Sequence, residues 1–337
     1  MNGVEEYDID SAWNDFCEDG IINNKHILNN DEESEYIPKG GDIYISTKTK
    51  IAYLTNIIDL QNVFWNIKVI PYHLQEIGVV KKQMKFNFAN DNEVKNMCEK
   101  LKKENNVEEQ IISRIINPEG RIKFRDIRKV SIGLCQKDIL SYRSKKRSAF
   151  YNCFVLILRI NIEDNYKEIH VKVFNTGKLE IPGIRDDITL IKTLDLLVEI
   201  IKVASKDETI SYDLSKCETV LINSNFNCGF YLNRDKLLDI LKYKYKVDCV
   251  YDACQYPGIQ CKYTCNNNEI IYKLSFMIFR TGSILIVGKC DEDVLYQVYN
   301  YIKDILNREY SEIYISNNDT QKSNINACDK KHKKRII

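Results

Sequence analysis

The stretch FNTGKLEIPGIRDDITLIKTLDLLVEII, residues 174–201, decides the fold because its plan returns later in the chain in other letters. The second copy is FRTGSILIVGKCDEDVLYQVYNYIKDIL, residues 279–306. In each copy an alternating strand ends at a Phe, a short connection carries a Gly, and a second strand runs to another Gly. Acidic residues and an amphipathic stretch follow, which predicts a helix. Two copies are too few for a solenoid, so we expect one domain with a twofold relation between its halves.

These hairpins resemble those of a known family. FNTGK and FRTGS are similar to the FxSGK hairpin of the TATA-box-binding protein family. The segment YDACQYPGIQCKY, residues 251–263, resembles the family's YxPxxFPGxxYR stretch, with Tyr256 where the family has Phe. The resemblance covers residues 43–308 and looks closest to the versions from giant DNA viruses. It implies an α+β saddle in which two pseudo-symmetric repeats form a curved antiparallel sheet with helices on the convex face.

The expected organisation has four parts. Residues 1–42 form an acidic, disordered tail, and residues 43–207 form the first repeat with a long basic insertion at about 74–147. Residues 208–312 form the second repeat, and residues 313–337 form a disordered basic tail. The acidic tail is solvated, docks a partner, or folds back as a mimic of DNA charge. The insertion extends a phosphate-binding track or carries charge only for solubility.

Composition limits the class of protein. With 337 residues and 44% hydrophobic content, the chain can bury one substantial core or two modest ones. Twelve Cys without a signal peptide or a long apolar run favour free thiols in a reducing compartment. No CxxC pair is present, so we expect neither a metal nor another cofactor. Phosphate-loop, HExxH and nucleophile-elbow motifs are absent too, and we expect no enzyme.

The second repeat breaks the alternation that is usual for a sheet covered on one side. Phe276 and Ile278 should face the helices. The side chains expected on the other face are apolar too: Met277, Phe279, Leu285 and Val287. Either a further layer covers this face, or it is an exposed apolar platform for a ligand. Because no remaining stretch is long and apolar enough to be that layer, we expect the platform.

An apolar platform flanked by cations suits insertion into a DNA minor groove, where aromatic wedges unstack bases and cations hold phosphates. The resemblance implies that Phe279 and Tyr256 are wedges of the second repeat and that Phe174 is one of the first. The companion of Phe174 is Phe150 by spacing or Phe154 by strand position. Thr47 and Thr219 stand where the family keeps a base-contacting Asn, and Arg159, Lys178 and Lys262 stand where it has phosphate-facing cations. The expected DNA-binding residues are thus Phe279, Tyr256, Phe174, Phe150, Met277, Leu285, Val287, Thr47, Thr219, Arg159, Lys178 and Lys262.

The first repeat departs from this pattern. Lys172, Glu180 and Pro182 take the places that Met277, Leu285 and Val287 hold in the second repeat. A carboxylate on a DNA-binding face would lose hydration near negative potential unless it pairs with Lys172. We therefore expect the second repeat to carry more of the DNA contact.

The resemblance implies a general transcription initiation factor that binds and bends AT-rich promoter DNA. Its expected partners are double-stranded DNA, a transcription factor IIB-like protein and RNA polymerase, and not a membrane. The expected location is intracellular, in a viral factory of the host cytoplasm or in the nucleus. The alternative is a protein-interaction module that keeps the fold but has lost specific DNA binding. An accessory domain of an enzyme is a weaker third hypothesis, because no nuclease domain follows.

Overall fold

The computed structural model describes residues 38–140, 151–267 and 270–315. All of them belong to one compact unit, Pro38–Ile337. The expectations for both tails, and for Phe150, therefore fall wholly or mainly outside the described residues. Within the described ranges no helix is both long and apolar enough to span a membrane.

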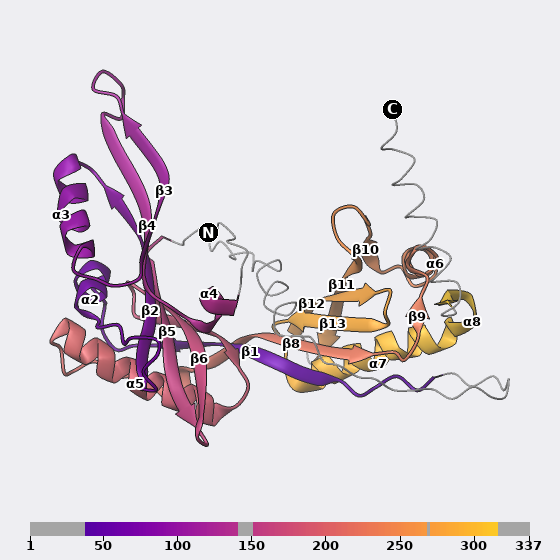
Figure 1. Cartoon of the computed structure of the whole chain (residues 1–337). Coiled ribbons are helices and arrows are strands. Elements are labelled where there is room, and N and C mark those ends of the chain that lie inside the picture. The colour runs from indigo at the N-terminus through magenta and orange to yellow at the C-terminus, as the bar shows by residue number, and fades with distance from the viewer. Residues whose placement is uncertain (1–37, 141–150, 268–269, 316–337) are drawn as a thin grey trace. The chain divides into compact units, whose positions relative to one another are not determined.

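Twelve antiparallel strands form the main sheet in the order β10-β11-β12-β13-β8-β1-β7-β6-β5-β2-β4-β3 (Figure 1). The strands of the first half are β1 (Tyr44–Tyr53), β2 (Gly78–Phe88), β3 (Val107–Ile116), β4 (Phe124–Gly133), β5 (Cys153–Ile162), β6 (Asn165–Phe174) and β7 (Lys178–Ile184). Those of the second half are β8 (Glu218–Asn227), β10 (Asp248–Val250), β11 (Gly258–Asn267), β12 (Ile270–Phe279) and β13 (Ser283–Gly288). A separate pair joins β9 (Tyr231–Leu232) to β14 (Tyr314–Ile315).

Two long helices follow the hairpins that the sequence predicted: α5 (Asp187–Ser205) after β7, and α7 (Glu292–Arg308) after β13. The shorter α-helices are α2 (Leu60–Asn66), α3 (Asp91–Leu101), α4 (Gln136–Leu140), α6 (Arg234–Asp239) and α8 (Tyr310–Ile313). A 3₁₀ turn, η1 (Leu214–Lys216), precedes β8, and a π-helical turn, η2 (Ile240–Lys244), follows α6.

The strand order confirms the two pseudo-symmetric repeats. Strands β1, β7, β6, β5 and β2 follow one another outward from the centre of the sheet, and β8, β13, β12, β11 and β10 do the same in the other direction. The first strands of the two repeats, β1 and β8, pair with each other. Phe174 ends β6 and Phe279 ends β12, each the third strand outward from the centre, so they occupy equivalent places. The fold is therefore α+β, with an antiparallel sheet built from two repeats.

The insertion of the first repeat enlarges the sheet. After β2 the chain forms α3, then β3 and β4, and β4 pairs with β2 while β3 forms the outer edge. In the second repeat the equivalent strand, β10, ends the sheet and has only three residues. The two halves of the sheet therefore differ in width.

Each repeat has its own core between its strands and its long helix. In the first repeat Leu156 and Val171 pack with Leu194 and Leu197 of α5. In the second repeat Phe276 and Ile286 pack with residues of α7. The side chains that alternate with these core residues point to the other side of the sheet, called here the distal face, which is the face away from α5 and α7.

Candidate nucleic-acid interface

Phe279 and Tyr256 come together on the distal face of the second repeat. Their ring centroids lie 6.1 Å apart, with the ring planes tilted by 57°. The Phe279 ring lies over Gly258, because a β-carbon on that Gly would stand 2.8 Å from Cε1 of the ring. The hydroxyl of Tyr256 lies 3.2 Å from Sδ of Met277. The aromatic pair proposed from the sequence is thus a pair in space.

The apolar side chains beside this pair are not exposed. Met277, Leu285 and Val287 lie on the distal face, but only 3%, 4% and 5% of their surface is accessible. The expectation of an exposed apolar platform is wrong for these three residues. Strand alternation fixes the face to which a side chain points, whereas its exposure depends on what packs over it. The sequence pattern predicted the face of the sheet but not the exposure.

On the distal face of the first repeat, Phe174 stands among charged groups. The Nζ atom of Lys178 lies 5.6 Å from the centroid of the Phe174 ring. Lys172 and Glu180 form an ion pair, with Nζ 2.7 Å from Oε1, and both side chains are partly buried. This pairing is the condition under which a carboxylate can remain on such a face. The first repeat therefore presents a paired charge where the second presents methyl and thioether groups.

The register of the sheet identifies the companion of Phe174. In the second repeat, Tyr256 stands two residues before the strand partner of Phe279. In the first repeat the partner of Phe174 is Cys153, so Tyr151 occupies the equivalent place. Its side chain is 54% exposed. The first repeat thus carries aromatic residues at the same register positions as the second.

Neither companion considered from the sequence takes this place. The side chain of Phe154 is wholly buried on the helix side, 6.4 Å from the ring of Phe64 in α2, so its assignment is wrong. Phe150 lies outside the described residues. The sequence spacing could have identified Tyr151 as the companion. Tyr151 lies 23 residues before Phe174, and Tyr256 lies 23 residues before Phe279.

Amide side chains line the distal face where the repeats meet. Asn223 and Asn225 of β8 stand opposite residues of β13 that point to this face. Asn223 Nδ2 donates to Thr47 Oγ1 at 3.3 Å, and Asn225 Nδ2 donates to Ser46 Oγ at 2.7 Å. Among the described residues Asn223 Oδ1 is buried and accepts no hydrogen bond. Thr47 therefore lies beside Asn223. The sequence analysis missed the two Asn, although they alternate along NSN.

Thr219 does not reach this face. The register between β1 and β8 shifts at Thr49, which leaves Thr219 opposite Lys50. Lys50 Nζ lies 3.7 Å from a carboxylate oxygen of Asp187 at the start of α5, so its side chain lies on the helix side. Residues directly opposite each other share a face of the sheet. The expected DNA contact of Thr219 is therefore wrong, because a bulge reverses the direction of its side chain.

Arg159 is also not a phosphate ligand. Its side chain is 6% exposed, and its Nη1 donates to the carbonyl oxygens of Tyr72 (3.1 Å) and Leu74 (2.6 Å). Its Nη2 lies 3.7 Å from Oε1 of Glu168. The expected role was wrong because the segment before β2 folds over this guanidinium and uses its donors.

The other two expected cations are accessible to solvent. Lys262 is exposed on β11, and Lys178 is partly exposed at the start of β7. Lys262 stands opposite Ser275 on one neighbouring strand and Asp248 on the other. Both lysines extend from strands that carry the aromatic pairs or flank them.

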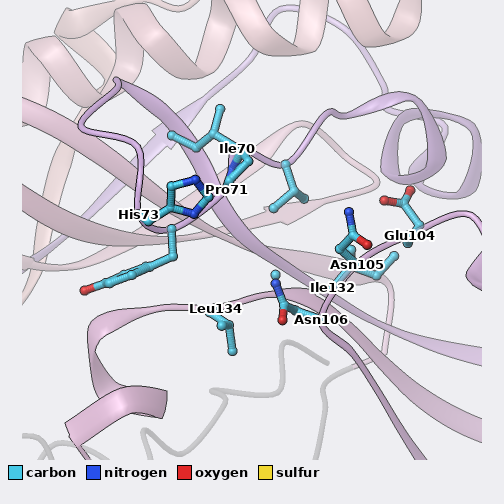
Figure 2. Close-up of a pocket in the computed structure, with 11 residues that line it drawn as sticks. Ile70, Pro71, His73, Glu104, Asn105, Asn106, Ile132 and Leu134 are labelled. Atoms are coloured by element: carbon cyan, nitrogen blue, oxygen red, sulfur yellow. The ribbon is translucent and has the colours of Figure 1, made fainter.

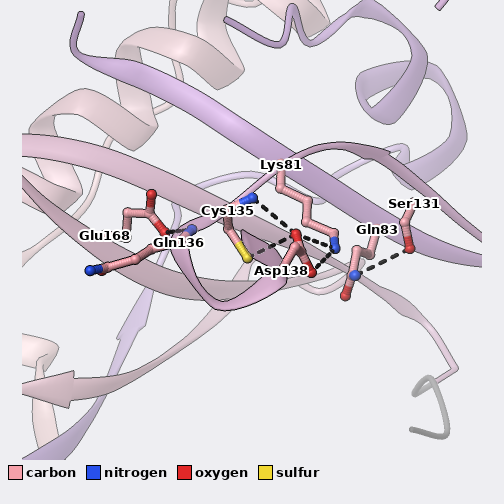
Figure 3. Close-up of polar contacts among 7 residues, drawn as sticks. All are labelled: Lys81, Gln83, Ser131, Cys135, Gln136, Asp138 and Glu168. Carbon is pink, nitrogen blue, oxygen red and sulfur yellow. Dashed lines mark hydrogen bonds and ion pairs between the residues drawn. The ribbon is translucent and has the colours of Figure 1, made fainter. Parts of the chain in front are cut away.

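A polar network holds α4 over the distal face of the first repeat (Figure 3). Lys81 Nζ donates to both carboxylate oxygens of Asp138 at 2.8 Å. Asp138 Oδ2 also accepts from the backbone N–H of Cys135 at 2.9 Å, and Glu168 accepts from that of Gln136 at 2.9 Å. Burial raises the pKa of Asp138, but hydrogen bonds from Lys81 and Cys135 outweigh it and leave that pKa below its ordinary value. Part of this face is thus covered by the chain itself.

A cavity of about 650 Å³ lies between the insertion and the segment that precedes β2, and Figure 2 shows the residues that line it. Its polar lining includes Tyr72, His73, Glu104 and Asn106. None of the residues expected to bind DNA lines it. Among the described residues no three His, Cys, Asp or Glu side chains gather as metal ligands. The described Cys are free, and burial raises the pKa of the Cys135 and Cys153 thiols to about 11, so both stay protonated at neutral pH.

Comparison with known proteins adds sequence evidence. No model of a known protein family matches the chain. A protein of Acanthamoeba polyphaga mimivirus, described as TATA-box-binding protein-like, is 28% identical over 207 residues, which are 53% of this chain and 54% of the relative. The chain thus spans about half the length of the curated relative it matches. A solved structure of Methanococcus jannaschii TBP overlaps 80% of this chain and 99% of its own with a TM-score of 0.39 at 13% identity, which is too loose to support an inference.

The strand order and the paired aromatic residues define a two-repeat α+β protein with a candidate groove-binding face. The similarity to the mimivirus protein confirms the resemblance read from the hairpins. The chain is thus similar in sequence to a mimivirus protein described as TATA-box-binding protein-like.

Proposed function

We propose that this chain is a transcription initiation factor that binds AT-rich promoter DNA through the minor groove and bends it. The observation that carries the proposal is the pair of equivalent aromatic sites, Tyr151 with Phe174 and Tyr256 with Phe279, on the face away from the long helices. Aromatic and apolar side chains inserted between base steps are the means by which groove-binding proteins kink a duplex. Cations beside them hold the phosphates on either side.

The second repeat is the stronger candidate for insertion. Unstacking a base step costs a few kcal/mol, which contact between the opened step and an apolar surface offsets. Phe279 stands beside apolar side chains, including Met277 and Leu285, which are buried and would have to become accessible to make this contact. Phe174 stands beside the Lys172–Glu180 pair, whose carboxylate would lose water against the negative potential of the groove. The proposed DNA contact is therefore unequal between the repeats.

The amides of Asn223 and Asn225 fit the same function. The minor groove offers acceptors on A·T pairs and an additional donor on G·C pairs. A side-chain amide can donate to those acceptors, and Asn223 already directs its Nδ2 to a hydroxyl on this face. These residues replace Thr219 as the proposed contacts at the centre of the sheet.

The wider function rests on the same proposal. A transcription factor IIB-like protein and RNA polymerase are the proposed partners, in a viral factory of the host cytoplasm or in the nucleus. The first repeat is proposed to span residues 43–207 with its insertion, and the second to span residues 208–312.

An alternative function is a protein-interaction module that has lost specific DNA binding. The burial of Met277, Leu285 and Val287 favours it, because apolar groups must become accessible before they can enter a groove. The Lys172–Glu180 ion pair on the distal face of the first repeat also favours this alternative function.

A binding assay separates these two functions. Fluorescence anisotropy would compare AT-rich and GC-rich duplexes with the full chain at two salt concentrations, with Phe279→Ala as the variant. The proposal requires tighter binding to the AT-rich duplex and a loss in the variant. Equal, weak binding to both duplexes that disappears at the higher salt, with no effect of the variant, would favour the interaction module.

A further inference from the structure

One cross-strand row on the distal face joins the inserted strands to the proposed DNA site. Lys129 of β4 stands opposite Lys85 of β2, and Lys85 stands beside Cys153 at the start of β5. Cys153 pairs with Phe174, and Phe174 is followed across the β6–β7 hairpin by Lys178. The row therefore places Lys85 of β2 and Lys129 of the inserted strand β4 in line with an aromatic residue and a cation of the first repeat.

Lys85 is held close to that aromatic site. Lys85 Nζ lies 3.4 Å from the centroid of the Tyr151 ring. Lys129 and Arg125 both lie on β4 at alternate positions that point to the same face as Lys85. The row thus gathers several basic side chains on one face of the sheet.

The second repeat has no such extension. The equivalent row runs from Gly258 through Phe279 to Ser283. Neither cross-strand neighbour of Phe279 in this row is a cation. Beyond β11 only β10 remains, and its three residues end the sheet. Strands β4 and β3 lie beyond β2 in the first repeat alone (Figure 1), so only there does the row extend past β2.

We infer that Lys85 and Lys129 bind backbone phosphates of duplex DNA beyond the base steps opened by the first repeat. This inference rests on the proposed function of the same face. Three strand spacings separate β4 from β6, which is roughly 14 Å. That distance corresponds to about four base pairs of duplex. The insertion thus lengthens the contact on one side and binds phosphate without reading bases.

The test is the salt dependence of binding to a long AT-rich duplex and to the same duplex shortened by about four base pairs at each end. The full-chain variant carries Lys85→Ala with Lys129→Ala. The matched control carries Lys102→Ala with Lys103→Ala, two exposed lysines in the turn after α3 and outside the row. A third variant, Lys85→Arg with Lys129→Arg, keeps the charge.

On the long duplex the alanine pair should lower the slope of log affinity against log salt by about 1.8, since each phosphate contact contributes about 0.9. Its deficit in affinity should shrink about tenfold between 50 and 200 mM salt. On the shortened duplex it should match the wild type, and the control and the arginine pair should keep the wild-type slope on both. An unchanged slope, with binding that still depends on Phe279, would overturn this inference and leave the proposed function standing. A wild-type chain that binds neither duplex would overturn both.

Discussion

The ring of Phe279 lies over Gly258 on the neighbouring strand, where a β-carbon would come within 2.8 Å of it. The equivalent position in the first repeat is Cys153, whose side chain is buried. The ring of Phe174 therefore cannot take the same position over its own partner. The two aromatic sites are equivalent in strand register, but their Phe rings cannot occupy the same position over the partner strand.

Gly258→Ala should displace the Phe279 ring without unfolding the protein, because Gly258 does not have a positive φ and Ala can adopt its backbone. We expect weaker binding to an AT-rich duplex and a smaller bend, with a nearly unchanged melting temperature. Anisotropy and a gel bend assay would measure the first two. Gly41→Ala is the control, because its β-carbon would make only an ordinary contact at 3.6 Å. Wild-type bending in Gly258→Ala would contradict the importance of this ring position.

Phe279→Ala should weaken DNA binding by roughly 1–3 kcal/mol, by analogy with aromatic stacking on bases. Phe174→Ala should cost less, because the Lys172–Glu180 pair beside it makes that face less suited to an opened base step. Both variants would be compared on one duplex by anisotropy. Equal losses, or a larger loss at Phe174, would show that the division between the repeats is wrong.

Arg159→Gln should destabilise the fold by about 1.5–3 kcal/mol, because the carbonyls of Tyr72 and Leu74 lose a charged donor. The salt dependence of DNA binding should not change. Lys262→Gln should give the opposite result, with unchanged stability and a slope lower by about 0.9. Urea denaturation and salt titrations measure the two effects. A reduced slope in Arg159→Gln would restore its role as a phosphate ligand.

Removal of residues 1–37 should leave the melting temperature nearly unchanged, since the described unit begins at Pro38. If the acidic segment mimics DNA, its removal should also tighten DNA binding, most clearly at low salt. A competition assay with the truncated chain and the full chain measures this. Unchanged affinity would reject the mimicry and would leave the fold as described.

Glu309 should make stability depend on pH. Hydrogen bonds from Lys244 and then from Tyr245 hold its pKa below the ordinary value of 4.5. A carboxyl with a lowered pKa in the folded state stabilises the protein above its ordinary pKa, and that contribution is lost as the pH falls through the folded value. Glu309→Gln should therefore be less stable at neutral pH and should lose less free energy of unfolding below about pH 4.5. Urea denaturation across this range tests it, and identical acid profiles would contradict it.

The hairpins and helix starts could be predicted because local chemistry decides them. Gly177 and Gly282 both have φ of +80°, which the FNTGK and FRTGS segments required of them. Asp186 begins α5 by accepting a hydrogen bond from the backbone N–H of Thr189, as its place before an apolar stripe indicates. In these places a few residues that are neighbours in sequence are enough to determine the local structure.

The failures concern properties that neighbours in sequence do not set. Thr219 was misplaced because one bulge between two strands distant in sequence changed its face. Arg159 was misread because a loop from the preceding part of the chain covers it. Tyr151 was overlooked because its role follows from strand register, which only the paired sheet defines. The burial of Met277 likewise depends on packing and not on alternation.

The insertion begins after β2, the outermost of the strands that the first repeat shares with the second, and β4 and β3 are added beyond it. The pairing of β1 with β8 at the centre is therefore independent of the insertion. Two repeats related by a twofold axis would meet a duplex equally well in either direction. A sheet with one long end and one short end has lost that equivalence. Under the proposed function, this difference would allow the chain to tell upstream from downstream.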